Sequence, residues 1–357
     1  MKVMIVTGGT GGHINPALAL AEILKQKDPK NEVVFIGSKV RMESTVIPEK
    51  GYRFFGLDLV SMHGNLIYKA KYVLDMYQAY RQAKQILKNE KPDICIGFGN
   101  YISVPVILAA HRLHIKTMIH EQNSFAGKAN KLLSRYVDGV VGCYNSNIDQ
   151  MPAGNVRILG NPEATLLKDI TFETAMLKNL ELQEDIPFVV FMMGSLGSSS
   201  VSKVIDEAIG MFDTDYQVII ATGKGNEYQY QSKLPENVKI VPYIDGKQAL
   251  KGCALAVTRA GATTIAEICA IPASSILIPS PFVANNHQYY NAKVLEDIGG
   301  AIMIEESKLT AKSLSETINA LMHDKQKLVA LKQNAYQLAK IDAADKMIMW
   351  IEEIING

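Results

Sequence analysis

Residues 8–13 have the sequence Gly-Gly-Thr-Gly-Gly-His and are separated from the apolar run at 3–6 by Thr7 alone. We predict a strand, a loop of nearly bare backbone, and a helix with Asn15 as N-cap and Pro16 at its first position. Glycines let main-chain N–H groups approach a bulky anion, and the positive end of a helix faces the same place. The loop therefore predicts a phosphate site with His13 at its mouth. A tight turn without a ligand is the alternative.

This loop does not match the common nucleotide-binding glycine motifs. Neither Gly9 nor Gly11 begins a Gly-x-Gly-x-x-Gly pattern, and the strand predicted near 33–37 is not followed by the acidic residue that would hold a ribose. The Gly-Lys pair at 223–224 lacks the earlier glycine and the following Ser or Thr of a P-loop. A dehydrogenase and a P-loop enzyme are therefore disfavoured.

Four further loops after predicted strands carry glycine or polar residues. Residues 97–103 form a second glycine loop, and 194–198 offer backbone N–H groups to a diphosphate. Residues 120–123, His-Glu-Gln-Asn, place four polar side chains in a row where a sugar could bind; a polar loop without a ligand is the alternative. Small residues open a helix within 259–267, and the carboxylate of Glu267 can accept both hydroxyls of a ribose.

The elements that must position these loops form two α/β halves. The 357 residues exceed one typical domain, and a hydrophobic content of 48% supplies two cores. Short apolar strands alternate with amphipathic helices twice over, which predicts two doubly wound parallel sheets with ligands beyond the carboxyl ends of their strands. We expect Gly160-Asn161-Pro162 to link the halves and the last helix to pack back across the linker. The predicted strands lie near 3–7, 33–37, 93–97, 116–120, 139–143 and 156–159, and near 188–193, 216–221, 238–242, 254–258, 274–279 and 301–304.

The net charge of +1 conceals an uneven distribution. Residues 1–160 hold 20 Lys+Arg against 12 Asp+Glu, which leaves 17 against 24 for the remainder. A helix predicted over about 67–88 mixes tyrosines with Lys and Arg, and such a helix can lie among acidic lipid headgroups. A solvated helix is the alternative. No recognition motif accompanies the charge, so we expect no nucleic-acid partner.

In order along the chain, these residues resemble the MurG family, membrane-associated transferases that add N-acetylglucosamine to undecaprenyl-diphosphoryl-N-acetylmuramoyl-pentapeptide in peptidoglycan synthesis. The resemblance covers the whole chain. The matching motifs are Gly8–His13, Gly37-Ser38 with Arg41-Met42-Glu43, Gly97–Pro105, His120–Asn123, Gly160–Pro162, Gly194-Ser195-x-Gly197, Thr222–Gly225, Tyr243–Asp245, Arg259-x-Gly261-Ala262-x-Thr264 with Glu267, and Gln288-Tyr289.

The resemblance implies a GT-B glycosyltransferase fold, in which two Rossmann-like doubly wound domains face a cleft. Residues 1–160 would form the acceptor and membrane-facing domain and 161–340 the UDP-N-acetylglucosamine domain. Residues 341–357 would form a helix on the first domain. The resemblance also implies a peripheral enzyme on the cytoplasmic face of the bacterial cell membrane, which it would meet through about 67–88.

The same resemblance implies two sets of contacts. The donor set would be Tyr243 and Ile244 at the uracil, Glu267 at the ribose, Ser195, Ala262, Thr263 and Thr264 at the diphosphate, and Asn123, His287 and Gln288 at the sugar. The acceptor set would be Thr10, Gly11, Gly12, His13, Gly99, Tyr101, Ser103 and His120 around the lipid-linked diphosphate and its sugar.

The implied chemistry is a single inverting displacement, in which the acceptor 4-hydroxyl attacks the anomeric carbon, UDP leaves and no metal is needed. His13 is the candidate general base, with contact to the acceptor diphosphate as its alternative role; His120 is the second candidate. Ala164 stands where many relatives carry an arginine, so one donor contact is missing. Arg259, Lys224 and Arg157 are candidates to compensate.

Three other functions are alternatives to this transferase. A glycolipid synthase that adds sugar to diacylglycerol shares the fold, but its acceptor has no diphosphate for the loop at 8–13. A UDP-N-acetylglucosamine 2-epimerase shares the nucleotide and has no use for a second diphosphate loop or a lipid-facing helix. A non-catalytic membrane-recruiting or nucleotide-binding module would not need Asn123, Glu267 and Gln288 together.

Overall fold

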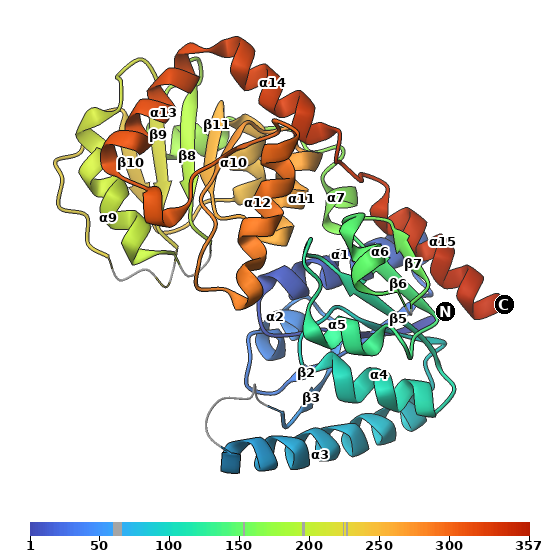
Figure 1. Cartoon of the computed structure of the whole chain (residues 1–357). Helices are drawn as coiled ribbons and strands as arrows, with labels where there is room; N and C mark the ends of the chain where they lie inside the picture. The colour runs from blue at the N-terminus through green and yellow to red at the C-terminus, as the bar shows by residue number, and fades with distance from the viewer. Residues whose placement is uncertain (60–65, 153, 195–196, 224, 226–227) are drawn as a thin grey trace. The chain divides into compact units, whose positions relative to one another are not determined.

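The computed structural model of the chain consists of two compact units (Figure 1). The first unit comprises Met1–Leu166 and Lys340–Gly357, and the second comprises Leu167–Ala339. All residues are described except 60–65, 153, 195–196, 224 and 226–227; for 66–71 only the backbone is described. The boundary falls later than the predicted turn at 160–162 because helix α7 (Glu163–Leu166) packs on helices of the first unit.

The first unit is built on a parallel sheet with the strand order β3-β2-β1-β4-β5-β6-β7. The chain proceeds outward from β1 to β3 and then returns to β4 on the other side of β1. This reversal creates a switch point between β1 and β4, where ligands of open parallel sheets bind. The strands are β1 Lys2–Val6, β2 Glu32–Ser38, β3 Arg53–Leu57, β4 Ile94–Gly97, β5 Lys116–Glu121, β6 Gly139–Gly142 and β7 Val156–Ile158.

Strand β3 was missed by the sequence pattern. It lies at the edge of the sheet, pairs only with β2 in the strand order, and begins with Arg53, which forms ion pairs with Glu32 (2.8 Å) and Glu90 (2.7 Å). Only Leu57 of this strand is buried. An edge strand needs no fully apolar sequence, so the pattern that marks buried parallel strands is absent here.

Helices cover both faces of the first sheet (Figure 1). On one face α1, α2 and α15 contribute to the same core as Val3 and Ile5; on the other face α3, α4 and α5 pack with Met4 and Val6. Alternate residues of β1 thus enter opposite cores. The helices are α1 Gly11–Lys27, α2 Glu43–Glu49, α3 Leu66–Glu90, α4 Ser103–Arg112, α5 Lys128–Leu133, α6 Ser146–Gln150, α7, and α15 Ala343–Asn356.

Helix α1 begins earlier than the sequence indicated. Thr10 is its N-cap and Pro16 lies inside it, so the prediction of Asn15 as N-cap and Pro16 as the first helical residue is wrong. Because Pro16 has no N–H, the carbonyl four residues earlier receives no helical hydrogen bond from it. The glycine loop itself forms the first turn of the helix.

Helix α15 belongs to the first unit although it ends the chain. Trp350, Met347 and Ile351 are buried in the same core as the first strand. A Cβ on Gly139 of β6 would lie 2.9 Å from the Trp350 ring, so a glycine leaves room for the indole. Arg157 stacks over that ring at 4.4 Å and forms an ion pair with Glu353 at 2.7 Å.

The second unit repeats the doubly wound plan with the strand order β10-β9-β8-β11-β12-β13, all parallel. Its switch point lies between β8 and β11. The strands are β8 Phe188–Met192, β9 Gln217–Ala221, β10 Val238–Val241, β11 Leu255–Thr258, β12 Ser275–Leu277 and β13 Ile302–Met303. The helices are α8 Ala175–Asn179, α9 Ser199–Ala208, η1 Ile209–Met211, α10 Gly246–Gly252, α11 Ala262–Ala270, η2 Ala284–Asn286, α12 His287–Asp297, η3 Glu306–Lys308, α13 Ala311–His323 and α14 Lys325–Tyr336.

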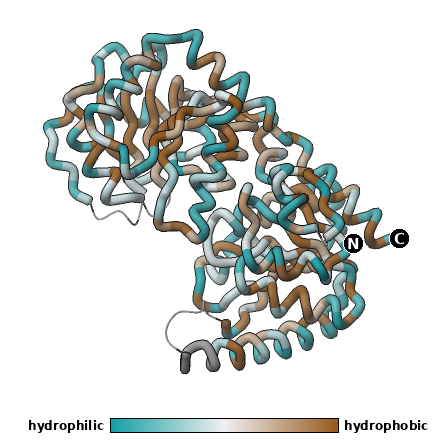
Figure 2. The backbone as a smooth tube through the Cα atoms, in the orientation of Figure 1, coloured by the Kyte–Doolittle hydropathy of each residue, from teal (hydrophilic) through white to brown (hydrophobic). Residues whose placement is uncertain are grey.

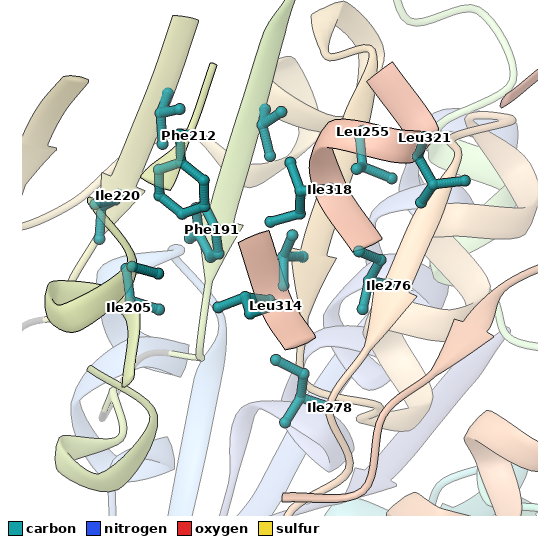
Figure 3. Close-up of a cluster of buried hydrophobic side chains, with 14 of the residues drawn as sticks. Phe191, Ile205, Phe212, Ile220, Leu255, Ile276, Ile278, Leu314, Ile318 and Leu321 are labelled. Carbon is teal, nitrogen blue, oxygen red and sulfur yellow. The ribbon is translucent and has the colours of Figure 1, made fainter. Parts of the chain in front are cut away.

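A core of large apolar side chains joins α9 and α13 to this sheet (Figure 3). Phe191 of β8 packs with Phe212 at a ring separation of 5.8 Å, and Leu314 and Ile318 of α13 lie in the same cluster. Hydrophobic residues follow the strands of both units (Figure 2). No helix among the described residues is long and apolar enough to span a membrane.

Candidate functional site

Two loops meet at the switch point of the first sheet. The loop at 8–13 follows β1, the loop at 97–103 follows β4, and Val6 pairs with Gly97 in the sheet register. Asn100 donates through Nδ2 to the Gly8 carbonyl (2.8 Å), and His13 Nδ1 lies 2.8 Å from the Phe98 carbonyl. The structure thus brings together the two glycine loops that the sequence assigned to the acceptor.

The contact with Phe98 determines the tautomer of His13. A carbonyl oxygen only accepts hydrogen bonds, so Nδ1 of His13 carries the proton and donates it. In the neutral ring Nε2 is then the basic nitrogen. Gly99 has a φ of +85°, and a Cβ there would lie 3.1 Å from the His13 ring, so glycine permits both the turn and the close approach.

The backbone of the first glycine loop retains donors for an anion. Among the described residues, none accepts a hydrogen bond from the N–H groups of Gly11 or Gly12. Both lie in the first turn of α1, where the helix dipole favours an anion. The predicted contacts by Thr10, Tyr101 and Ser103 stay predictions. Ser103 itself is buried and donates to the Gly99 carbonyl at 2.5 Å.

The buried carboxylate of Glu43 supports this loop by hydrogen bonds to its backbone. The sequence analysis named Glu43 only as part of a motif and assigned it no function. The residue is 1% exposed; Oε2 accepts from the Gly9 N–H and Oε1 from the Ser38 N–H, both at 3.0 Å. A Cβ on Gly8 or Gly37 would collide with its side chain. The motif at 41–43 was visible in sequence, but the buried carboxylate between two strand ends is a feature of the tertiary structure.

His120 is fully buried beside the same loops. Its Nε2 lies 3.0 Å from the Gly160 carbonyl and therefore donates, and its ring stacks on Phe98 at 5.0 Å. Burial lowers the pKa of His120 to about 4, so the ring is neutral near pH 7. This setting suits a side chain that positions its neighbours, and a direct acceptor contact by His120 stays a prediction.

Asn123 is held by a buried carboxylate. Glu121 is 2% exposed and accepts from the Asn123 N–H (3.0 Å), the Gly127 N–H (2.9 Å) and Asn130 Nδ2 (2.8 Å). Asn147 donates to the Asn123 carbonyl at 3.0 Å. Asn123 belongs to the first unit, whereas the other predicted donor-site residues belong to the second.

The switch point of the second sheet carries a pocket of about 550 Å³. Thr264 and Gln288, both predicted at the donor, line it. The side-chain oxygen Oε1 of Gln288 accepts a hydrogen bond from the Ser280 N–H at 2.9 Å, which leaves the side-chain NH₂ as its donor. Arg259 and the exposed Phe282 also line the pocket. Its remaining lining residues are Met193, Gly194, Gly197, Ser198, Ser199, Ser200, Gly261 and Ser280.

Of the other predicted donor residues of the second unit, those that the structure describes are not on the lining of this pocket. Ala262 and Thr263 are buried in the first turn of α11, and Glu267 is half-buried one turn further. Tyr243 is exposed and Ile244 half-buried in the segment before α10. His287 donates from Nδ1 to the Ala284 carbonyl at 2.9 Å. Ser195, predicted at the diphosphate, and Lys224, a candidate to compensate for the missing arginine, lie outside the described residues.

The sequence analysis expected no Asp-x-Asp sequence that could hold a metal; this is wrong, because one occurs at 213–215. Asp213, Asp215 and His323 place ligand atoms within 4.8 Å of one another. Asp213 and Asp215 precede β9, at the amino end of the sheet and away from the pocket at the carboxyl ends. His323 already lies 2.9 Å from Asp213, and the pair raises the pKa of His323. This cluster is therefore separate from that pocket.

Comparison with known proteins gives the family. Residues 3–141 match the glycosyltransferase family 28 N-terminal domain and 188–347 match the family 28 C-terminal domain. A UDP-N-acetylglucosamine--N-acetylmuramyl-(pentapeptide) pyrophosphoryl-undecaprenol N-acetylglucosamine transferase of Limosilactobacillus fermentum is 38% identical over 99% of both chains. The enzyme of the same name from Listeria monocytogenes is 36% identical over the full length of both chains.

Solved structures support the same family. MurG of Acinetobacter baumannii superposes with a TM-score of 0.77 at 25% identity, covering 99% of both chains. A putative UDP-N-acetylglucosamine 2-epimerase from Listeria monocytogenes has a TM-score of 0.71 at 13% identity, over 98% of this chain and 95% of that one, and shows the fold alone. The predicted GT-B fold class is confirmed. The chain belongs to glycosyltransferase family 28 and, within it, to the MurG family of N-acetylglucosamine transferases.

Proposed function

We propose that this enzyme transfers N-acetylglucosamine from UDP-N-acetylglucosamine to the 4-hydroxyl of N-acetylmuramoyl-pentapeptide on undecaprenyl diphosphate. Its full-length relatives are named for transfer to that lipid-linked acceptor. The observation that carries the proposal is the presence of two anion-suited sites, one at the switch point of each sheet. A transferase that joins a nucleotide sugar to a lipid diphosphate needs one site for each diphosphate.

The second unit would bind the donor. Its pocket is lined by a glycine loop, by the start of α9 and by residues just before and in the first turn of α11, where backbone N–H groups and helix dipoles favour a diphosphate. When the glycosidic bond breaks, negative charge develops on UDP, and preorganised donors stabilise it without solvent reorganisation. Glu267, one turn along α11, would accept the ribose hydroxyls. This arrangement supports an inverting displacement without a metal.

The first unit would bind the acceptor. The N–H groups of Gly11 and Gly12 would bind its diphosphate, and Nε2 of His13 would accept the proton of the attacking hydroxyl. Contact between His13 and the diphosphate is the alternative role for the same nitrogen. The glycolipid synthase and the epimerase both lack a lipid-diphosphate acceptor, so this loop supports the transferase over both.

Helix α3 would bring the first unit to the cytoplasmic face of the membrane. Ala79, Ala83 and Leu87 are buried, whereas Val73 and Tyr77 are 68% and 58% exposed. Arg81, Lys84 and Lys88 follow on the same helix and line a shallow groove with Tyr77. One stripe is thus in the core and another presents apolar and basic groups, a composition that favours acidic lipid surfaces. The side chains of 66–71 lie outside the described residues.

The decisive experiment is transfer of labelled N-acetylglucosamine from UDP to a short-chain lipid-diphosphoryl-muramoyl-pentapeptide, with UDP release followed in parallel. We expect transfer and acceptor-dependent UDP release. Transfer to diacylglycerol instead would support the glycolipid synthase. Conversion of UDP-N-acetylglucosamine to its C2 epimer without acceptor would support the epimerase. Binding without any turnover would contradict the catalytic proposal.

A further inference from the structure

A closed ring of four polar side chains lies beside the pocket of the second unit. Arg259 donates from Nη2 to Ser198 Oγ (2.6 Å), which lies 3.1 Å from Ser200 Oγ. Ser200 donates to Glu306 Oε1 (2.6 Å), and Glu306 Oε2 lies 2.6 Å from Arg259 Nη1. The ring joins the start of α9 to the segments that follow β11 and β13. Three of its members line the pocket, and Glu306 does not.

The contact between Arg259 and Glu306 is mainly a charge interaction. Nη1 of Arg259 donates its hydrogen bond to the Ile278 carbonyl (3.1 Å), and Glu306 Oε2 accepts no aligned hydrogen bond from the described residues. The two side chains are only 11% and 12% exposed, so water screens their attraction weakly. The positions of both groups are nevertheless fixed by other bonds, because Ile278, Ser198 and Ser200 hold them independently of the ion pair.

Arg259 is the only basic side chain on the described lining of this pocket. Ala164, where an arginine was expected from the family resemblance, is a buried alanine of α7 and offers no charge. Among the described residues, the Arg259 guanidinium is thus the cation that would face a diphosphate in this pocket, and it also contacts a carboxylate.

We propose that Glu306 sets the affinity of the donor pocket for the nucleotide diphosphate by competing with it for the Arg259 guanidinium. The inference rests on the proposed function, because it takes the pocket as the donor site. A carboxylate on the far side of the guanidinium weakens the attraction for UDP. Weaker binding of UDP favours product release, which limits turnover in many enzymes.

The substitution Glu306→Gln tests this role. Glutamine retains an oxygen that can accept from Ser200 and removes the negative charge. We expect UDP to bind about three- to tenfold more tightly than to the wild type at low salt, as measured by calorimetry on the full chain. Uridine, which lacks phosphate, should bind unchanged to both proteins. The gain for UDP should shrink at about 0.5 M salt because added ions screen the charge.

Two controls accompany this variant. Glu305→Gln removes a neighbouring carboxylate that pairs with the exposed Lys308 at 2.6 Å, and we expect it to leave UDP affinity within about twofold of wild type. Glu306→Asp keeps the charge and should also stay close to wild type. If Glu306→Gln fails to fold, Glu306→Ala takes its place. UDP should then bind more tightly to Glu306→Ala than to the wild type, and as tightly to Glu306→Asp as to the wild type.

The outcomes separate this inference from the proposed function. If the wild type binds no UDP, the donor assignment itself fails. If the wild type binds UDP but Glu306→Gln matches Glu305→Gln, or binds UDP more weakly, the competition is overturned. An equal change for uridine and UDP would also overturn it, since the effect would then be structural rather than electrostatic.

Discussion

The two units share one sheet plan but place different chemical groups at their switch points. Both are doubly wound parallel sheets whose loops meet at a switch point. In the first unit the loop donors are backbone N–H groups, with His13 beside them and a buried Glu43 bonded to the backbone below. In the second unit a guanidinium joins the glycine loop, and Glu306 partly neutralises it.

This difference separates what the sheet topology contributes to a binding site from what the side chains contribute. The reversal of strand order provides the place and the helix N-termini in both units. The side chains then decide how strongly charged the place is. A neutral backbone site with a titratable imidazole suits proton transfer, whereas a guanidinium suits a leaving diphosphate. The variants below test whether the two functions divide between the units in this way.

The largest expected effect comes from His13→Ala in the first unit. Loss of a general base typically lowers the rate by about 10²- to 10⁴-fold. We expect kcat to fall in that range while UDP affinity, which our proposal assigns to the second unit, stays unchanged in calorimetry. A normal kcat with a raised acceptor KM would instead assign His13 to the acceptor diphosphate. Weakened UDP binding would contradict the division between units.

A pH effect is also expected in the first unit. The folded pKa of His120 is about 4, below its ordinary value of 6.5, so the folded state binds fewer protons than the unfolded state between these values. The free energy of unfolding should therefore fall by about 3 kcal/mol as the pH drops from 6.5 to 4. Urea unfolding at several pH values would measure this slope. In His120→Asn the slope should decrease; an identical slope would exclude His120 as its source.

Membrane attachment is a further property expected of the first unit alone. Replacing Arg81, Lys84 and Lys88 by Gln removes two exposed cations and one half-buried cation from α3, each worth on the order of 1 kcal/mol at an acidic surface. We expect partition to acidic vesicles to fall by about 100-fold in co-sedimentation. A matched control, Lys325, Lys327 and Lys332 to Gln on α14, should leave partition unchanged. Equal loss in both triple variants would indicate that net charge alone controls binding.

The smallest of the four effects is expected from Glu267→Ala in the second unit. Hydrogen bonds to a charged group contribute about 1.5–3 kcal/mol, so UDP-sugar KM should rise by about 10- to 100-fold. Acceptor KM and kcat at saturating donor should change little. Glu267→Gln, which retains one acceptor, should lie between. An unchanged donor KM would remove Glu267 from the ribose site.

Local sequence patterns were enough to predict most of the strands and the positions of the main loops. Apolar runs predicted every strand except β3, whose edge position allows a charged and half-exposed sequence. The glycine loops were placed at strand ends, but the helix was expected to begin at Asn15. Glycine propensity disfavours helix locally, and only the packed sheet shows that the loop itself is the first turn of α1.

The sequence by itself determined the two doubly wound halves, the family and the positions of the glycine loops at strand ends, because these depend on short patterns along the chain. The tertiary structure alone decided the partners of the buried charges. Glu43 lies under Gly8 and Gly37, and Arg259 faces Glu306, because a parallel sheet brings the ends of distant strands to one edge. No spacing in the sequence encodes that meeting, since it depends on the order of strands in space.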